Sequence, residues 1–330
     1  MQLTGLGKSF VCALLGGASA IAGAGTASAQ FHPYAPECDR ACLTGHLDAY
    51  LAAQAANDPS GLPFADDVRV TENGVDIAPG EGIFRTADEP TFRLDVVDPE
   101  MGAIATNLVV KEGDAHAFEM VRLKVAGGEI TEVETIVGRE GESGPMFAPD
   151  FATEPSREYL LTLVPSDQNS RLELMAVADA YWRALETNGE PEYNAAPLLP
   201  GALRIENGLA TTNGSQPGTM GGNTPSGAGG SSASQQFDTG AFVSRTIYDR
   251  RFPVVDVERG LILSIARMGL EEGYDMPAHW QGGRPVLAEI FAVQDGKITA
   301  INVVMKSTIP LEQSMGWPRD PLTRSKSDPN

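Results

Sequence analysis

Apolar residues recur with the spacing of a helix in two stretches of the chain. Asp39 can cap the first helix, and Ser170 with Glu173 forms a capping box for the second. Each helix carries one apolar stripe. The stripes are Leu43, Leu47, Tyr50 and Leu51 in the first helix, and Leu174, Ala178, Tyr181 and Trp182 in the second. Long runs of alternating apolar and polar residues follow both stretches.

The alternating runs predict β-strands joined by short turns. A hairpin over 68–77 is centred on Asn73-Gly74, a pair that favours a two-residue turn. Further strands are expected at 91–97, 103–111, 116–125 and 130–137, and again at 252–255, 261–268, 285–293 and 298–305. A helix followed by hairpin-linked strands is an α+β pattern with an antiparallel sheet.

Short sequence segments repeat in the same order as these patterns. The segment 69–74 recurs as 204–208, and 96–102 recurs as 254–260. Four further short matches keep the same order, which indicates a tandem duplication. We therefore expect two similar domains whose sheets pack across a pseudo-twofold axis as an internal pseudo-dimer, with further association left open.

The domain boundaries follow from the repeat and from composition. The halves run over 38–138 and 157–309, joined by a linker over 139–156 that is rich in Gly, Pro and acidic residues. Residues 210–236 form a low-complexity loop that we expect to be mobile and dispensable for folding. The tail runs over 310–330, and we expect it to be polar and loose after Pro318.

The first 29 residues have the pattern of a secretory signal peptide. Lys8 precedes an apolar stretch over 10–22, and Ala27-Ser28-Ala29 is a small-residue cleavage site. Glycines interrupt the stretch, and it is shorter than the roughly 20 residues of a membrane span. We therefore expect a secreted or periplasmic protein, cleaved near Ala29 and without a membrane span.

Composition and motifs exclude several classes of function. Against 24 Lys and Arg stand 44 Asp and Glu, and the net charge of −20 argues against a nucleic-acid binder. Phosphate-loop, His-Glu-x-x-His and Gly-x-Ser-x-Gly motifs are missing, so we predict no metal and no cofactor. Cys38 and Cys42 are within reach of a disulfide across one helical turn, with free thiols as the alternative.

The repeated unit resembles the nuclear transport factor 2-like superfamily and, more narrowly, its SnoaL-like branch. The resemblance covers nearly all of 38–309 and rests on the segments 38–43, 69–74 and 251–256, which look like those of exported fungal and bacterial proteins without a settled function. It implies two cone-shaped domains, each a curved sheet around helices with a mostly apolar pocket. Relatives include cofactor-independent isomerases, epoxide hydrolases, cyclases, dehydratases and lyases, and proteins that only bind. None of their catalytic motifs matches this chain residue by residue.

Two carboxylates fall on apolar strand faces. Glu119 alternates with apolar residues over 117–125, and Glu289 does so over 287–293. Desolvation raises the pKa of such a group, which can then act as a general acid or base near neutral pH. The alternative is a structural pairing with a nearby arginine.

Histidines and tyrosines supply further candidates. His116 and His279 occupy matching places before a strand and could shuttle a proton, the alternative being exposed loop-end residues. Tyr50 and Tyr181 lie on the helix stripes, where they either donate to a substrate oxygen or only pack.

We place the working site in the second half. Glu289 would be the acid or base, with His279 as its proton partner and Tyr181 as a donor. The expected substrate-binding residues are Tyr50, Arg267, Tyr274 and Trp280. Arg267, on the neighbouring strand, would orient Glu289 or bind an anionic substrate group. Tyr274 and Trp280 would form an aromatic wall beside His279. The prediction is an exported, cofactor-independent lyase, isomerase, dehydratase or hydrolase that acts on a small apolar or aromatic molecule. The alternatives are a non-catalytic binding protein and an interaction module.

Overall fold

The computed structural model describes residues 36–142, 146–192, 194–213, 231–274, 283–310, 313–321 and 323. The predicted signal peptide over 1–29 lies outside these residues. Residues from Pro36 onward belong to one compact unit. Within the described ranges, none of the helices has the length and apolar character needed to cross a membrane.

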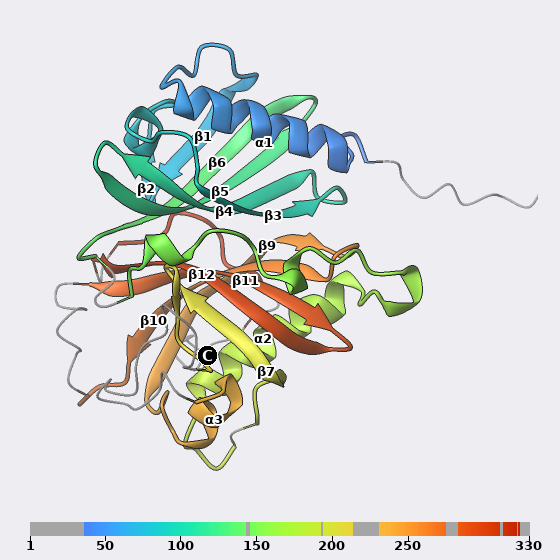
Figure 1. The fold of residues 1–330 in the computed structure, drawn as a ribbon, viewed down its shortest axis with the longest axis vertical. Coiled ribbons are helices and arrows are strands. Elements are labelled where there is room, and N and C mark those ends of the chain that lie inside the picture. The colour runs from blue at the N-terminus through green and yellow to red at the C-terminus, as the bar shows by residue number, and fades with distance from the viewer. Residues whose placement is uncertain are drawn as a thin grey trace, which may run out of the picture. The chain divides into compact units, whose positions relative to one another are not determined.

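The first half consists of one long helix and six strands (Figure 1). Its elements are α1 (Arg40–Ala55), β1 (Phe64–Glu72), β2 (Val75–Ile77), the 3-10 turn η1 (Gly82–Arg85), β3 (Phe92–Asp98), β4 (Ala103–Glu112), β5 (Ala115–Ala126) and β6 (Glu129–Arg139). The Asp39 side chain accepts from the Cys42 N–H at 2.9 Å and caps α1. A Cys38–Cys42 disulfide staples the start of the helix, as predicted.

The second half repeats this plan after three short 3-10 turns, η2 (Pro149–Phe151), η3 (Arg157–Tyr159) and η4 (Pro165–Asp167). Its elements are α2 (Arg171–Glu186), β7 (Leu198–Glu206), β8 (Leu209–Ala210), α3 (Ala233–Asp238), β9 (Arg245–Asp256), β10 (Leu261–Leu270), β11 (Arg284–Gln294) and β12 (Lys297–Ile309). The predicted capping box of Ser170 and Glu173 begins α2.

The two sheets have the same strand order, β2-β1-β6-β5-β4-β3 and β8-β7-β12-β11-β10-β9. This order confirms the predicted α+β class with two tandem domains. Each sheet differs from the expected antiparallel pattern at one place, because β1 pairs with β6 and β7 with β12 in parallel. Asn73-Gly74 and Asn207-Gly208 form the expected turns with positive φ. Both Asn side chains also bond the backbone of the parallel partner strand.

The core consists of three hydrophobic clusters, and one of them joins the two halves. One lies between α1 and the first sheet, a space that we name the first cone, and one lies between α2 and the second sheet, the second cone. The third cluster contains residues of both sheets, including Leu94 and Met120 from the first and Leu263 and Ile290 from the second. The sheets therefore pack through their outer faces, as a pseudo-dimer requires. We name this contact between the sheets the seam.

Reciprocal ion pairs cross the seam. Arg40, the first residue of α1, donates to both carboxylate oxygens of Asp256 at 2.6 and 3.0 Å. Arg171, the first residue of α2, donates to one carboxylate oxygen of Asp98. Asp256 and Asp98 are buried, and each accepts a backbone N–H from the strand that carries the other, from Val97 at 3.2 Å and from Val255 at 2.9 Å. We name these four charged residues the clamp. Each half contributes one arginine and one aspartate to the clamp, as expected for a contact between parts related by twofold symmetry.

Two segments expected to be loose are packed in part. Residues 231–236, at the end of the predicted loop 210–236, enter α3, where Ala233 and Gln236 are buried because Gln236 bonds Arg204 and the Thr211 backbone. Residues 214–230 lie outside the described residues. The tail also differs from the prediction. After Pro318, the Asp320 N–H donates to the Arg250 backbone at 3.0 Å and Thr323 is buried, and before it Met315 is buried in the seam cluster.

The clamp predicts a large loss of stability when one of its cations is removed. Arg171→Met leaves the buried Asp98 carboxylate without its ion-pair partner. We expect this to lower the free energy of unfolding by about 3 kcal/mol in urea titrations. The matched control is Arg93→Met, because Arg93 pairs with Asp48 and Asp95 within one half and is more exposed. That variant should lose no more than about 1 kcal/mol. Equal small losses in both variants would contradict the role of the clamp.

Candidate functional site

Glu119 lies inside the first cone, on the predicted apolar face of β5. Its side chain is fully buried, and its Oε2 accepts from Gln54 Nε2 at 2.8 Å, while no described residue bonds Oε1. Burial raises its pKa to about 8. The Gln54 hydrogen bond opposes this shift, and the nearby Glu72 and Glu112 reinforce it. Glu119 is therefore a carboxylic acid at neutral pH.

A small cavity lies beside Tyr50 in the first cone. Tyr50 packs edge-on against Phe84, with ring centroids 5.3 Å apart. A cavity next to these rings, bounded also by Val70 and Ile83, has a volume of about 10 Å³. That is room for about one water molecule. Burial and the Glu119 charge raise the pKa of Tyr50 well above its usual value, so the phenol stays protonated.

Glu289 lies inside the second cone, on β11, with polar neighbours of a different kind. Its side chain is buried, and no described residue donates to its Oε2. Burial raises its pKa well above the usual value, the nearby Glu206 adds to the shift, and Arg204 opposes it. Burial therefore favours the protonated form of Glu289, although a cation lies close by.

Arg204 organises the polar side of the second cone. It is buried on β7, donates from Nε to Thr211 Oγ1 at 3.0 Å, and also bonds Gln236 and the Tyr181 hydroxyl. Tyr181 itself packs against Trp182, Phe237 and Phe291. The Tyr181 phenol and the Glu289 carboxyl interact closely enough for burial and the Glu289 charge to raise the pKa of the tyrosine. The second cone thus brings together an acid, a phenol and a guanidinium.

The two carboxylates share a face but not a position along their strands. Glu119 lies opposite Leu108 of β4, whereas Glu289 lies opposite Ser264 of β10. Counted from the repeated Gly102 and Gly260, the counterpart of Ser264 is Thr106, which faces Val121. Glu289 is therefore displaced by one same-face step relative to Glu119, which explains why Glu119 meets Gln54 and Glu289 meets Tyr181.

Other predicted residues do not converge on these acids. His116 lies on β5 on the face that packs in the seam, because residues alternate along a strand and Phe118 of the same parity belongs to the seam cluster. Arg267 likewise shares parity with Ile265 of that cluster, so the prediction that it orients Glu289 is wrong. Its guanidinium instead donates to the backbone oxygens of Gln313 at 2.5 Å and Pro310 at 3.0 Å.

The predicted aromatic wall is described only in part. Tyr274 follows β10 and is 54% exposed. His279 and Trp280 lie outside the described residues. Cys38, Cys42 and His46 approach one another as metal ligands would, but the disulfide occupies both sulfurs. The donor set therefore does not fit a metal ion in this state.

Sequence reasoning missed Gln54 and Arg204. The sequence contained a signal for Arg204. The segment Glu-Asn-Gly occurs in both halves, and the residue two positions before it is Val70 in the first half and Arg204 in the second. A charged residue at an apolar position of a repeat marks a polar interior. Gln54 had no such signal, since its contact with Glu119 spans 65 residues.

The raised pKa of Glu119 predicts a pH-dependent stability. The native state keeps a proton up to about pH 8, whereas the unfolded chain loses it near pH 4.3, so the free energy of unfolding falls by about 1.4 kcal/mol per pH unit between these values. Glu119→Gln removes this slope. Urea unfolding of both proteins between about pH 5 and pH 8 measures the difference.

Glu134 provides a control with the opposite sign. Burial alone would raise the pKa of this carboxyl, but Arg251 and Arg122 outweigh burial and hold its pKa below the usual value. The pH-dependent part of its contribution is therefore lost only in acid, and Glu134→Gln should change stability by a constant amount over the same range. Parallel curves for the wild type and Glu119→Gln would contradict a neutral Glu119.

Comparisons with known proteins place the chain in a family. Among curated proteins, none matches it. A de novo designed protein with a curved β-sheet is 16% identical over 30% of this chain and 87% of its own, with a TM-score of 0.26. A proposed ketosteroid isomerase from Kribbella flavida DSM 17836 is 18% identical over 37% of this chain and 90% of its own, with a TM-score of 0.24. A family model matches residues 36–137 and 167–305, well over half of the sequence. The chain belongs to the family described as Domain of unknown function (DUF8021).

Proposed function

We propose that the protein is a cofactor-independent acid–base enzyme whose working site is the second cone. The observation that carries this proposal is the buried Glu289, whose Oε2 has no donor among the described residues and which lies close to Arg204 and Tyr181. A buried acid without a partner costs stability, and such a cost is typical of a group kept for chemistry. Glu119 also has one carboxyl oxygen without a described donor, but its other oxygen is held by the Gln54 amide and no described guanidinium or phenol hydroxyl bonds it.

The protonation state sets the direction of the chemistry. Because Glu289 rests as a carboxylic acid, it can give its proton to a substrate carbonyl oxygen while its other oxygen accepts the proton from the adjacent carbon. The products are an enol and a carboxyl group that is again protonated. Returning the proton to a different carbon is an isomerisation, and loss of a neighbouring group from the enol is a dehydration or lyase reaction.

The walls of the second cone indicate the substrate class. Tyr181, Trp182, Phe237 and Phe291 form an aromatic cluster in the second cone, and Tyr181 lies close to the acid. The substrate we propose is therefore a small apolar or aromatic carbonyl compound. Tyr181, held by Arg204, is the donor that steadies the developing oxyanion.

We also infer that the chain works after export, in a secreted or periplasmic setting. The signal-like pattern of 1–29 and the Cys38–Cys42 disulfide both support an oxidising compartment. The SnoaL-like branch of the nuclear transport factor 2-like superfamily remains our proposal for the closest structural class, on the basis of the helix and curved sheet in each half.

Hydrogen–deuterium exchange tests the chemistry without knowledge of the natural product. The mature chain is incubated in D2O with a panel of aromatic ketones, lactones and β,γ-unsaturated ketones, and NMR follows deuterium entering the carbon next to the carbonyl. We expect catalysed exchange with at least one compound, and Glu289→Gln should slow it by about a hundredfold to ten-thousandfold. The rate should fall as pH rises through the elevated pKa of Glu289, because the acid form is lost.

Glu119→Gln is the matched control, since it removes the same group from the other cone and should leave the exchange rate unchanged. If Glu119→Gln abolishes exchange and Glu289→Gln does not, the working site lies in the first cone. If the compounds bind without any exchange, the protein is a binding protein and the enzymatic proposal is wrong.

A further inference from the structure

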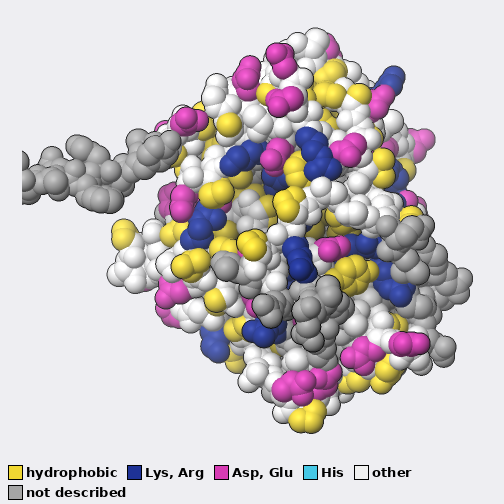
Figure 2. Space-filling view, turned by 180° about the vertical axis from the view of Figure 1, so that it is seen from behind, with side chains coloured by type: hydrophobic (Ala, Val, Ile, Leu, Met, Phe, Trp, Pro, Cys, Tyr) yellow, Lys and Arg dark blue, Asp and Glu magenta, His cyan; other side chains and the backbone are white. Residues whose placement is uncertain are grey.

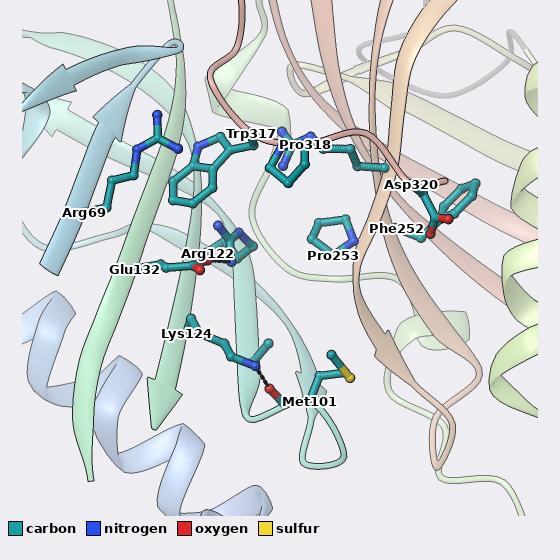
Figure 3. Close-up of a pocket in the computed structure, with 12 residues that line it drawn as sticks. Arg69, Met101, Arg122, Lys124, Glu132, Phe252, Pro253, Trp317, Pro318 and Asp320 are labelled. Carbon is teal, nitrogen blue, oxygen red and sulfur yellow. Dashed lines mark hydrogen bonds and ion pairs between the residues drawn. The ribbon is translucent and has the colours of Figure 1, made fainter. Parts of the chain in front are cut away.

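A groove opens at one end of the seam, away from both cones. Its volume is about 400 Å³. Figure 3 shows its walls, which come from β5 and β6 of the first half, β9 of the second half and the C-terminal segment. The residues that line it are Arg69, Met101, Ala103, Arg122, Lys124, Glu132, Arg251, Phe252, Pro253, Trp317, Pro318 and Asp320. On the face shown in Figure 2, Lys and Arg side chains gather across the middle, although the chain carries a charge of −20.

A buried triad forms the floor of the groove. Glu134 of β6 accepts from Arg122 of the same half at 3.0 Å, and both of its oxygens accept from Arg251 of the other half at 2.5 and 3.0 Å. The side chains of all three residues are at least nine-tenths buried. Burial of this kind fixes the guanidinium groups in place, so the floor is a built structure and not a set of mobile surface charges.

Lys124 is a groove cation that has no ion-pair partner among the described residues. Its strand neighbour Glu132 pairs with Arg122 at 2.7 Å instead, and the described contact of Lys124 is with the Met101 backbone oxygen. The three cations Arg122, Arg251 and Lys124 thus face the two carboxylates Glu132 and Glu134. No described carboxylate forms an ion pair with Lys124, and Asp320 lies beside Phe252, across the groove from it (Figure 3).

The duplicated half shows that the fold does not need these charges. Counted from the bulge that both sheets share, the positions of Arg122 and Lys124 on β5 correspond to Ile290 and Ala292 on β11. The remaining counterparts, by the same strand pairing, are Ala300 for Glu132, Asn302 for Glu134 and Leu94 for Arg251. Most of these counterparts are apolar members of the seam cluster. The same architecture therefore closes with hydrophobic packing at one end of the seam and with charges and a groove at the other.

The groove also has an apolar wall. Trp317 lies near two guanidinium groups, with the Cζ atoms of Arg69 and Arg122 at 4.2 and 4.7 Å from its ring, and its Nε1 donates to Thr71 Oγ1 at 3.0 Å. Pro253 stands opposite the indole and next to Arg122 (Figure 3). A flat apolar group would contact these rings while a charged end reaches the lysine.

We propose that this groove binds a small organic monoanion, a carboxylate with an aromatic or other apolar body. The carboxylate pairs with the Lys124 ammonium and the edge of the Arg122 guanidinium, and the apolar body packs between Trp317 and Pro253. The Lys124 ammonium, which pairs with no described carboxylate, matches one ligand carboxylate, and the surrounding rings favour an organic acid over an inorganic anion.

Calorimetric titration of the mature chain with benzoate tests the site, with benzamide as the neutral analogue and inorganic phosphate as the anion without an apolar body. Benzoate should bind more tightly than either, and its affinity should fall as salt is added. Lys124→Met keeps the aliphatic stem and removes the charge, so it should weaken benzoate binding by about ten- to a hundredfold. Lys297→Met, which removes an exposed lysine at the start of β12, is the matched control and should bind as the wild type does.

Three outcomes would overturn the proposal. They are no benzoate binding at about 10 mM, equal affinity for benzoate and benzamide or phosphate, and equal effects of the two lysine variants. Thermal unfolding of Lys124→Met shows whether the variant is folded, and the reversed charge in Lys124→Glu must abolish binding if the variant folds. Glu289→Gln should bind benzoate normally, so failure of the acid–base proposal and failure of this site are separate results.

Discussion

The clamp across the seam is the constraint on which the other parts of the molecule depend. A buried aspartate at the end of β3 and its repeat at the end of β9 each accept an arginine from the helix start of the opposite half. Each aspartate also accepts a backbone N–H from the facing strand, so neither half completes its own strand end without the other. Burying a carboxylate is tolerable only when it is paired and hydrogen-bonded, and the facing half provides the arginine and one of the backbone N–H donors of each aspartate. The duplication therefore has a physical consequence, because the two cones form one cooperative unit and not two independent modules.

In a twofold arrangement, equivalent positions of the two halves have similar environments. Positions at which the two halves differ are therefore informative. At the helix starts and at the strand ends the two halves obey the symmetry. They depart from it inside the cones, where Val70 corresponds to Arg204, and along the seam, where Ile290 and Ala292 correspond to Arg122 and Lys124. Where one half has charged residues and the other half has apolar residues at the same positions, the fold does not require the charges. Selection for a ligand or a reaction would retain such charged residues. This reasoning makes the second cone and the charged end of the seam the two functional candidates.

Much of the architecture follows from the sequence because its determinants are local. The Asp39 cap, the Ser170 capping box and the Asn-Gly turns act within a few residues of themselves, and alternation along the strands fixed the face of Glu119 and Glu289 correctly. Contacts between segments that are far apart in the sequence could not be predicted in this way. Arg267 was assigned to Glu289 because the strands are neighbours, yet its parity turns it toward the seam, where the tail binds it. The exact position of Glu289 needed the register of β10 and β11, which a sequence does not show.

The electrostatics of the two buried acids explain why the fold stays stable although it contains both of them. A carboxylate inside an apolar cone would need a cation to compensate it, and a cation held that closely would lower its pKa and remove its acid function. The chain avoids this outcome by keeping both groups neutral, with an amide donor at Glu119 and with Arg204 committed to Tyr181, Thr211 and Gln236 beside Glu289. The guanidinium can therefore stabilise negative charge on a substrate oxygen through Tyr181 without first ionising the acid. Glu134 in the seam shows the contrasting solution, since two arginines hold it as a carboxylate and make it structural. The difference between these buried glutamates lies in the number of cations that touch each one, and it separates a proton donor from an ion-pair anchor within one chain.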